Sequence, residues 1–296
     1  MEENLLKNTN FNPYSCTACP VRCGADRING VGACGSNLKI AKYYLHPFEE
    51  PCISFDKGSG TIFFCGCNLR CVFCQNYELS RAQRGKAITT DELVAIFQKL
   101  EEMGADNISL VTPSHLIPFL LPALKRYKPK IPLVYNSSGY DEVEMLKLID
   151  PFVDIYLPDL KFYSPSLSKR YTGKSDYFEK AEKALLFMAN KPVRFDERGK
   201  MLSGVIVRHL VMPLCSNDSI SLLKWFKAHM PPACYLSIMS QYTPFGEIEN
   251  FPELNRKITA REYNAVLHTA EDLSIENLFV QERSSSNEKY IPSWDF

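Results

Sequence analysis

Short apolar segments alternate with amphipathic segments from residue 58 to residue 280. The short segments are rich in β-branched and aromatic side chains, which is typical of strands. They predict strands at residues 61–64, 107–111, 133–135, 153–157, 205–211, 235–239 and 275–280. Apolar residues at helical spacing predict helices between them, at residues 89–103, 115–127, 141–149, 176–190, 218–229 and 259–273.

This alternation gives six strand–helix units in sequence and therefore predicts an α/β fold with a parallel sheet and right-handed crossovers. Continuous apolar strands fit a sheet that helices cover. Six units are fewer than the eight of a closed barrel, so we expect an open sheet. Three segments follow from the pattern: a cysteine-rich N-terminal segment at residues 1–57, the α/β unit at 58–280 and a tail at 281–296. The tail either packs as a lid or is disordered.

Composition adds three expectations. The 34 basic and 34 acidic residues give a net charge of zero, which disfavours a nucleic-acid partner. The first ten residues hold no signal-like apolar run, and prolines interrupt the longest apolar segment, residues 116–124. We therefore expect a cytoplasmic protein with no membrane partner. Eleven cysteines in such a chain favour metal or redox chemistry over a disulfide framework.

The most informative motif is Cys67-x3-Cys71-x2-Cys74, directly after the first predicted strand. Three thiolates on one tight loop can hold three irons of a [4Fe-4S] cluster and leave the fourth iron open to another ligand, whereas electron-transfer clusters use four cysteines. Two alternatives compete: core packing of buried thiols, and a zinc site with Cys65 as its fourth ligand. The polar neighbours of the cysteines favour the cluster.

A second group of cysteines lies in the N-terminal segment, at Cys16, Cys19, Cys23 and Cys34. Their spacing could close a tetrahedral metal site, with either zinc or an auxiliary iron–sulfur cluster. The alternative is a cap of thiols that bind no metal. A segment with so few large apolar residues would gain from a metal.

Polar residues also stand at or just after the predicted strands, where ligands bind in parallel α/β folds. They are Thr112, Asn136, Ser138, Asp159, Lys161, Arg208 and Gln241. Lys161 and Asp159 could be a plain surface pair, but their position after an apolar strand favours a site. Arg208 lies inside an apolar strand, where a buried guanidinium needs an anion.

The cysteine motif resembles that of the radical S-adenosylmethionine (SAM) superfamily. The chain is most similar to the pyruvate formate-lyase activating enzyme group, in its activase-related branch of uncertain function. The resemblance rests on residues 58–64 (GSGTIFF), 135–140 (YNSSGY) and 159–161 (DLK) and covers residues 58–280. It implies an open partial (β/α)6 barrel with the cysteine-rich segment as an N-terminal extension.

The resemblance also implies an activity and site roles. A [4Fe-4S] cluster would cleave SAM reductively to a 5′-deoxyadenosyl radical, which abstracts hydrogen from a substrate such as a glycyl-radical enzyme; flavodoxin or ferredoxin would supply the electron. Lys161 and Arg208 would bind the methionyl carboxylate, Asn136 and Ser138 the ribose, and a carbonyl near Thr112 the amino group. Gln241 would lie beside the methionine end. Asp159, with Asn136 and Ser137, matches a region that binds a monovalent cation.

Two family features are absent from the sequence. The glycine-glycine-glutamate segment that holds the SAM amino group is replaced by residues 112–115, and no ferredoxin-like insert follows Cys74. Radical modification of a small molecule, another peptide or RNA is therefore an alternative. A cluster- or zinc-binding scaffold without turnover is an alternative of another class.

Overall fold

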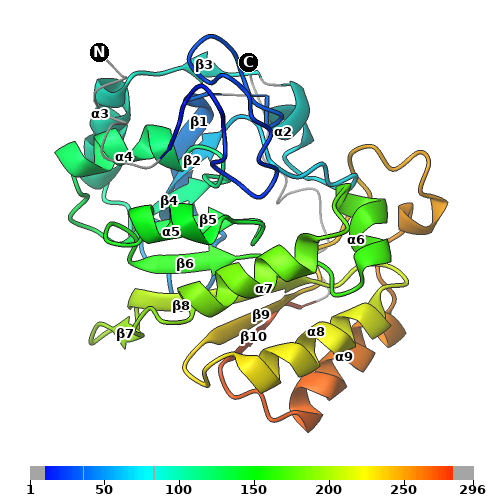
Figure 1. Cartoon of the computed structure of the whole chain (residues 1–296). Helices are drawn as coiled ribbons and strands as arrows, with labels where there is room; N and C mark the ends of the chain where they lie inside the picture. The colour runs from blue at the N-terminus through cyan, green and yellow to red at the C-terminus, as the bar shows by residue number, and fades with distance from the viewer. Residues whose placement is uncertain (1–10, 36, 83, 283–296) are drawn as a thin grey trace.

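A computed structural model describes residues 11–35, 37–82 and 84–282 of the chain (Figure 1). The sheet in these residues has the spatial order β10-β9-β8-β6-β5-β4-β2-β1-β3. Its parallel strands are β2 (Ser59–Phe64), β4 (Ile108–Val111), β5 (Leu133–Ser137), β6 (Ile155–Pro158), β8 (Met201–Leu210), β9 (Tyr235–Met239) and β10 (Leu278–Val280). Since β2 and β10 lie far apart in this order, the barrel is open, as predicted.

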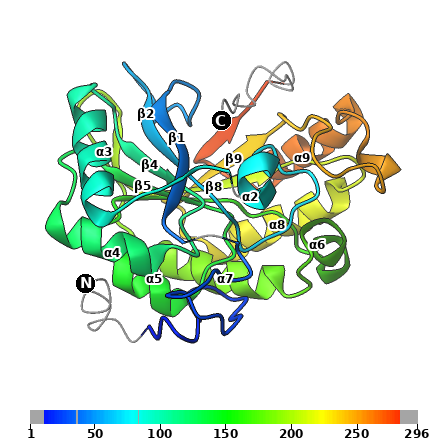
Figure 2. The same ribbon diagram turned by 90° about the horizontal axis from the view of Figure 1, so that it is seen from above.

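The helices cover the outer face of the curved sheet, with α3, α4, α5, α7, α8 and α9 along an arc (Figure 2). They are α3 (Thr90–Glu102), α4 (Ile117–Arg126), α5 (Val143–Ile149), α7 (Tyr177–Met188), α8 (Ser216–His229) and α9 (Ala260–Asp272). Helix α3 begins where the sequence predicts, because Thr89 and Glu92 form a capping box. All six predicted helices are confirmed.

The core follows from the alternation of side chains along the strands. Leu110 and Tyr135 belong to a large apolar cluster that includes Leu146 of α5 and Leu185 of α7. Val134, the neighbour of Tyr135, belongs to a smaller cluster. Burial on both faces explains why the strands read as continuous apolar runs.

Several elements were not predicted. Strand β1 (Lys39–His46) pairs antiparallel with β2, so part of the N-terminal segment joins the sheet. The others are α2 (Tyr77–Ala82), β3 (Lys86–Ala87), α6 (Pro165–Thr172), β7 (Arg194–Phe195) and the 3-10 helix η1 (Pro252–Leu254). Strand β1 escaped prediction because its burial does not alternate along the strand.

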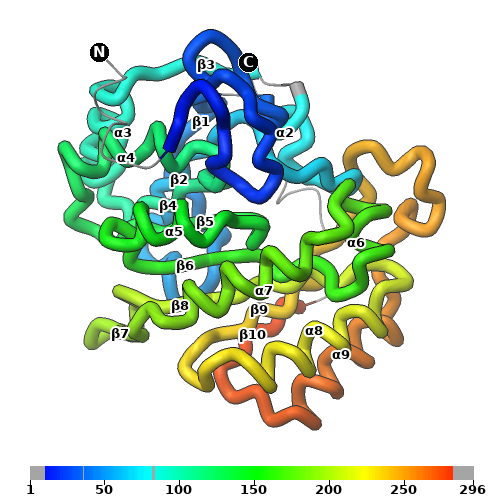
Figure 3. The backbone as a smooth tube through the Cα atoms, viewed as in Figure 1, coloured from blue at the N-terminus to red at the C-terminus, as the bar shows by residue number. Residues whose placement is uncertain are grey.

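Residues 11–35 form loops that pack beside the barrel (Figure 3). Arg22 in these loops pairs with Glu142 at the start of α5, at 3.0 Å. Residues 1–10 of the predicted N-terminal segment, and the predicted tail beyond Glu282, lie outside the described residues. Within the described part of the chain, every helix is too short or too polar to cross a membrane.

Candidate active site

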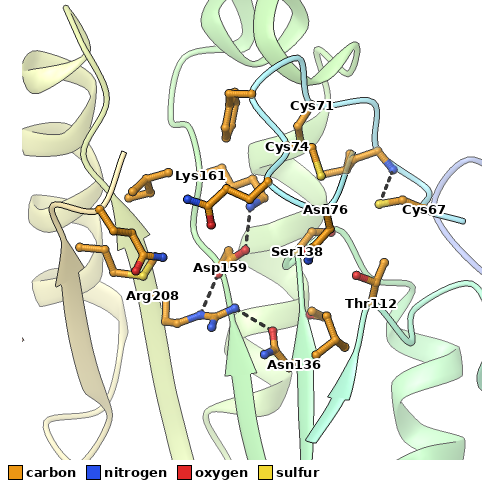
Figure 4. A pocket seen from close by; sticks show the side chains of 18 of the residues that line it. Cys67, Cys71, Cys74, Asn76, Thr112, Asn136, Ser138, Asp159, Lys161 and Arg208 are labelled. Atoms are coloured by element: carbon orange, nitrogen blue, oxygen red, sulfur yellow. Dashed lines mark hydrogen bonds and ion pairs between the residues drawn. The ribbon is translucent and has the colours of Figure 1, made fainter. Parts of the chain in front are cut away.

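One pocket of about 250 Å³ lies where the parallel strands end (Figure 4). It is lined by all ten residues that the sequence nominates for the barrel, namely Cys67, Cys71, Cys74, Thr112, Asn136, Ser138, Asp159, Lys161, Arg208 and Gln241. The parallel register explains this convergence: Val111 pairs with Asn136, and Asn136 with Leu157, so the strands end at one edge. The four N-terminal cysteines do not line this pocket.

The cysteine loop follows β2 and is fixed by its backbone. The amides of Arg70 and Val72 donate to the carbonyls of Thr172 and Tyr171 at the end of α6, at 3.1 and 3.0 Å. The Leu69 amide donates to the Cys67 sulfur at 3.4 Å, and the Ser80 hydroxyl to the Cys74 sulfur at 3.6 Å. These contacts hold the three thiols around one end of the pocket.

The arrangement of the thiols bears on which metal they suit. Within the described residues, no three Cys, His, Asp or Glu side chains converge on a single-ion position. A zinc ion needs such convergence, whereas each thiolate of a cluster binds a different iron. Burial raises the pKa of Cys71 to about 12, so metal binding at this loop would release protons.

A charge cluster faces the thiols from β6 and β8. Asp159 accepts from Lys161 Nζ at 2.7 Å and from Arg208 Nε at 2.9 Å, and Arg208 also donates to Asn136 Oδ1 at 2.7 Å. Burial alone would raise the pKa of Asp159, but Arg208 and Lys161 hold it below its ordinary value. One carboxylate therefore orients two cations, whose remaining N–H donors can bind an anionic ligand.

Tyr177, which the sequence analysis missed, fixes the backbone under this cluster. Its buried hydroxyl accepts from the Lys161 amide at 2.9 Å and lies 2.8 Å from the carbonyls of Ser138 and Asp159. Gly139 has φ 75° and packs directly on the Asp159 carbonyl, leaving no room for a Cβ. Nothing in the sequence pattern marks Tyr177, because this role exists only once α7 packs under two strand ends.

We expect Gly139→Ala to lower the free energy of unfolding by about 2 kcal/mol or more, because the new Cβ meets the Asp159 backbone in addition to a left-handed φ. Gly199→Ala is the matched control: its φ is 79°, but nothing lies within 4 Å of the added Cβ. Urea unfolding of both variants measures the difference. If both variants lost the same free energy of unfolding, the close contact between Gly139 and the Asp159 backbone would be contradicted.

Three further residues of the pocket carry signs of a ligand site. Thr112 has φ 62°, an uncommon conformation for a β-branched residue and one that clusters at functional sites. The buried Ser138 hydroxyl has no hydrogen-bond partner among the described residues. Gln241 accepts from the Gln281 side chain at 3.2 Å, which holds its amide in place.

One wall of the pocket, which the sequence pattern does not predict, is formed by His46 at the end of β1 and by Phe48 and Glu49 after it. Glu49 is almost buried, and its carboxylate lies 3.6 Å from Arg208 Nη1. The pKa of Glu49 is raised to about 7, mainly because the carboxyl is buried. Arg208 lowers this pKa, whereas the neighbouring acids Glu50 and Asp159 raise it further. The sequence gives little indication of this wall, because it follows a strand whose apolar residues show no clear periodicity.

The raised pKa of Glu49 predicts a pH-dependent stability. A carboxyl whose folded pKa exceeds its ordinary value of 4.5 stabilises the fold below pH 4.5 and loses that contribution as pH rises to about 7. The wild type should therefore lose stability as the pH rises, whereas Glu49→Gln should not. Between pH 4.5 and pH 8, the free energy of unfolding of Glu49→Gln should rise relative to that of the wild type by on the order of 2 kcal/mol. Urea unfolding at several pH values tests this, and a difference that does not change with pH would contradict it.

The chain is 29% identical over 291 residues to an uncharacterised protein of Methanocaldococcus jannaschii, covering 94% of this chain and 78% of that protein. It is similar to the structure of Streptococcus suis SuiB bound to precursor peptide SuiA, with 14% identity, TM-score 0.48 and coverage of 73% and 46% of the two chains. It is also similar to the structure of HydG, a maturase of the [FeFe]-hydrogenase, with 13% identity and TM-score 0.47. That match covers 76% of this chain and 52% of the HydG chain. The chain spans about half the length of these solved structures.

The family model of the radical SAM superfamily matches residues 61–195. The matched region begins in β2 and ends in β7, so it contains the cysteine loop and the Asp159–Lys161 pair. This is the superfamily that the cysteine motif indicates. Residues 61–195 are a radical SAM domain, and the ends of its strands β4, β5 and β6 form part of the pocket wall.

Proposed function

We propose that this protein holds a [4Fe-4S] cluster on Cys67, Cys71 and Cys74 and cleaves SAM reductively. One observation carries the proposal: the three motif thiols and the Lys161–Asp159–Arg208 charge cluster line the same pocket. A scaffold that only binds a cluster needs the cysteines but has no use for two oriented cations opposite them. The radical SAM family match supports the same chemistry.

The residues present fit the two groups. The Cys67–Cys74 loop offers three thiols that line one pocket, and each could bind a different iron of a cluster. Lys161 and Arg208 would bind the methionyl carboxylate of SAM, and Asn136 with the Ser138 hydroxyl, which has no partner among the described residues, would bind its ribose. A backbone carbonyl near Thr112 would accept from the amino group, and Gln241 would lie beside the methionine end.

The bound cluster would supply one electron to the SAM sulfonium, whose bond to the 5′ carbon breaks to give methionine and a 5′-deoxyadenosyl radical that takes hydrogen from a substrate. The chain's own contribution is binding and orientation. Asp159 pre-orients Lys161 and Arg208, so less side-chain freedom is lost when the carboxylate binds. Phe63, Phe73 and Leu69 line the pocket with apolar surface, which limits water around the reacting atoms.

The substrate proposed first is a peptide, such as the glycine loop of a glycyl-radical enzyme, with flavodoxin or ferredoxin as electron donor. Support comes from the sequence resemblance to the activating enzymes at residues 58–64, 135–140 and 159–161. Small molecules, other peptides and RNA are the alternatives. A glycyl radical seen by electron paramagnetic resonance in a candidate partner would distinguish them.

A monovalent cation near Asp159, Asn136 and Ser137 also remains a prediction. Both carboxylate oxygens of Asp159 already accept from Lys161 and Arg208, so a cation would have to share them.

Lys161→Met tests the proposed carboxylate contact. Loss of one charge-assisted hydrogen bond costs about 1.5–3 kcal/mol, so the Kd for SAM should rise about 10- to 100-fold. Lys183→Met is the control, because Lys183 forms an exposed pair with Glu179 on α7. Equilibrium dialysis with labelled SAM measures both. An unchanged Kd for Lys161→Met would remove this residue from the proposed site.

A further inference from the structure

Four cysteines outside the barrel pocket lie together in the N-terminal loops. Cys16, Cys19 and Cys34 are at most 7% exposed, and Cys23 is exposed. A Cβ at Gly32 would lie 3.3 Å from the Cys23 sulfur and 3.4 Å from the Cys34 sulfur, so both thiols approach one point. Cys16 in turn contacts Cys23 through a hydrogen bond between their side chains. The four cysteines that are close in sequence therefore also lie close together in space.

Hydrogen-bond donors and one buried cation lie against these thiols. Backbone amides of Ala25 and Ala33 donate to the Cys23 sulfur, and that of Val21 donates to the Cys19 sulfur. The Arg27 guanidinium, 2% exposed, lies 3.4 Å from the Cys16 sulfur. Four metal-bound thiolates are anionic, and such amide donors and a buried cation offset that charge. Thiols that only fill space would need neither.

The segment has little regular structure and a small apolar cluster of its own. Residues 11–35 contain neither helix nor strand, and their own buried apolar cluster is Phe11, Cys16 and Ala18 with Ala25 packed against it. Ordering a residue costs about 1–2 kcal/mol of backbone entropy, which so small a cluster offsets poorly. Metal binding would supply the missing free energy, as it does in small metal-stabilised domains.

We propose that Cys16, Cys19, Cys23 and Cys34 form a four-thiolate metal centre, separate from the barrel pocket. No three of these thiols converge on a single-ion position in the described structure. A zinc ion would therefore require the thiols to rotate, whereas an iron–sulfur cluster binds one iron per thiolate and accepts a wider spacing. An iron–sulfur cluster is the expected occupant, and zinc is the other metal that four thiolates accept.

The centre would touch the cysteine loop of the barrel. The Cys34 carbonyl accepts from the Cys67 amide at 3.2 Å. Arg27 also donates to the His115 carbonyl at 3.4 Å, and the His115 ring contacts the Cys65 carbonyl at 3.1 Å. Two connections therefore join the N-terminal loops to the loop that carries the cluster motif. Emptying the centre should loosen that loop and lower its metal loading.

The test uses the full chain with Cys67, Cys71 and Cys74 changed to alanine, purified without oxygen or chelator. Metal and sulfide analysis should find either about four irons with about four sulfides or about one zinc per chain. Adding Cys19→Ser should remove this metal, whereas adding Cys52→Ser should not, because Cys52 packs in another apolar cluster. A folded triple variant with less than about 0.1 metal per chain would overturn the proposal.

A second comparison keeps the proposal testable if the triple variant does not fold. The wild type and Cys19→Ser are then compared after identical iron and sulfide reconstitution. The wild type should hold metal in excess of one cluster, and the variant should lose that excess. Equal metal contents in the two folded proteins would overturn the four-thiolate centre without bearing on SAM cleavage at the barrel.

Discussion

Replacing Cys71 with alanine is expected to lower the iron content by one cluster and to abolish formation of 5′-deoxyadenosine. Cys71 is one of the three thiols at the pocket, and two thiolates cannot hold a cluster that already lacks a fourth protein ligand. Iron analysis and chromatography of the reaction products measure the two effects. We expect at least a 100-fold loss of product, because without the cluster no electron reaches SAM.

Cys65→Ala is the matched control for this change. Cys65 is buried two residues before the motif, and its thiol contacts the Arg84 carbonyl at 2.7 Å, away from the pocket. This variant should keep both iron and activity. If Cys65→Ala lost its metal as completely as Cys71→Ala, a four-cysteine site would replace the three-cysteine cluster.

Replacing Asp159 with alanine should give the largest loss of stability among the site variants. Lys161 and Arg208 are 19% and 16% exposed, and both bind this carboxylate. Removing one partner of a largely buried ion pair costs about 3 kcal/mol, because the remaining charges lose their counter-ion. Urea unfolding measures this loss. SAM binding should weaken as well, since the two cations lose their orientation.

Asp56→Ala serves as the control for Asp159→Ala. Asp56 pairs with Arg198 at 2.9 Å, but both side chains are about 60% exposed. Exposed pairs contribute about 0–1 kcal/mol, so this variant should unfold almost like the wild type. If Asp159→Ala were equally stable, the charge cluster would be a set of ordinary surface contacts.

The sequence predicted the parallel strands and the site residues on them for one physical reason. A buried strand needs an unbroken apolar run, and its carboxyl end lies at the ligand edge of the sheet. Arg208 was recognisable because a guanidinium inside such a run requires an anion, and the structure provides Asp159. The cysteine motif was recognisable because its three thiols lie within one loop.

Other parts of the site could not be read from the sequence. Glu49 reaches the pocket only because β1 pairs with β2, and β1 lacks a periodic pattern. Tyr177 acts through a hydroxyl that bridges two strand ends from α7. The positive φ of Thr112 depends on the turn after β4, and the residue type does not predict it. Contacts between distant segments decide all three.

The most direct test of the proposed function is reductive cleavage of SAM by the reconstituted wild-type protein. The protein is loaded with iron and sulfide without oxygen, reduced, mixed with SAM and assayed for 5′-deoxyadenosine by chromatography. The cluster at Cys67, Cys71 and Cys74 predicts product that depends on both reductant and SAM. An intact cluster that gives no product, and whose spectrum SAM does not change, would contradict the proposal and favour a cluster-binding scaffold.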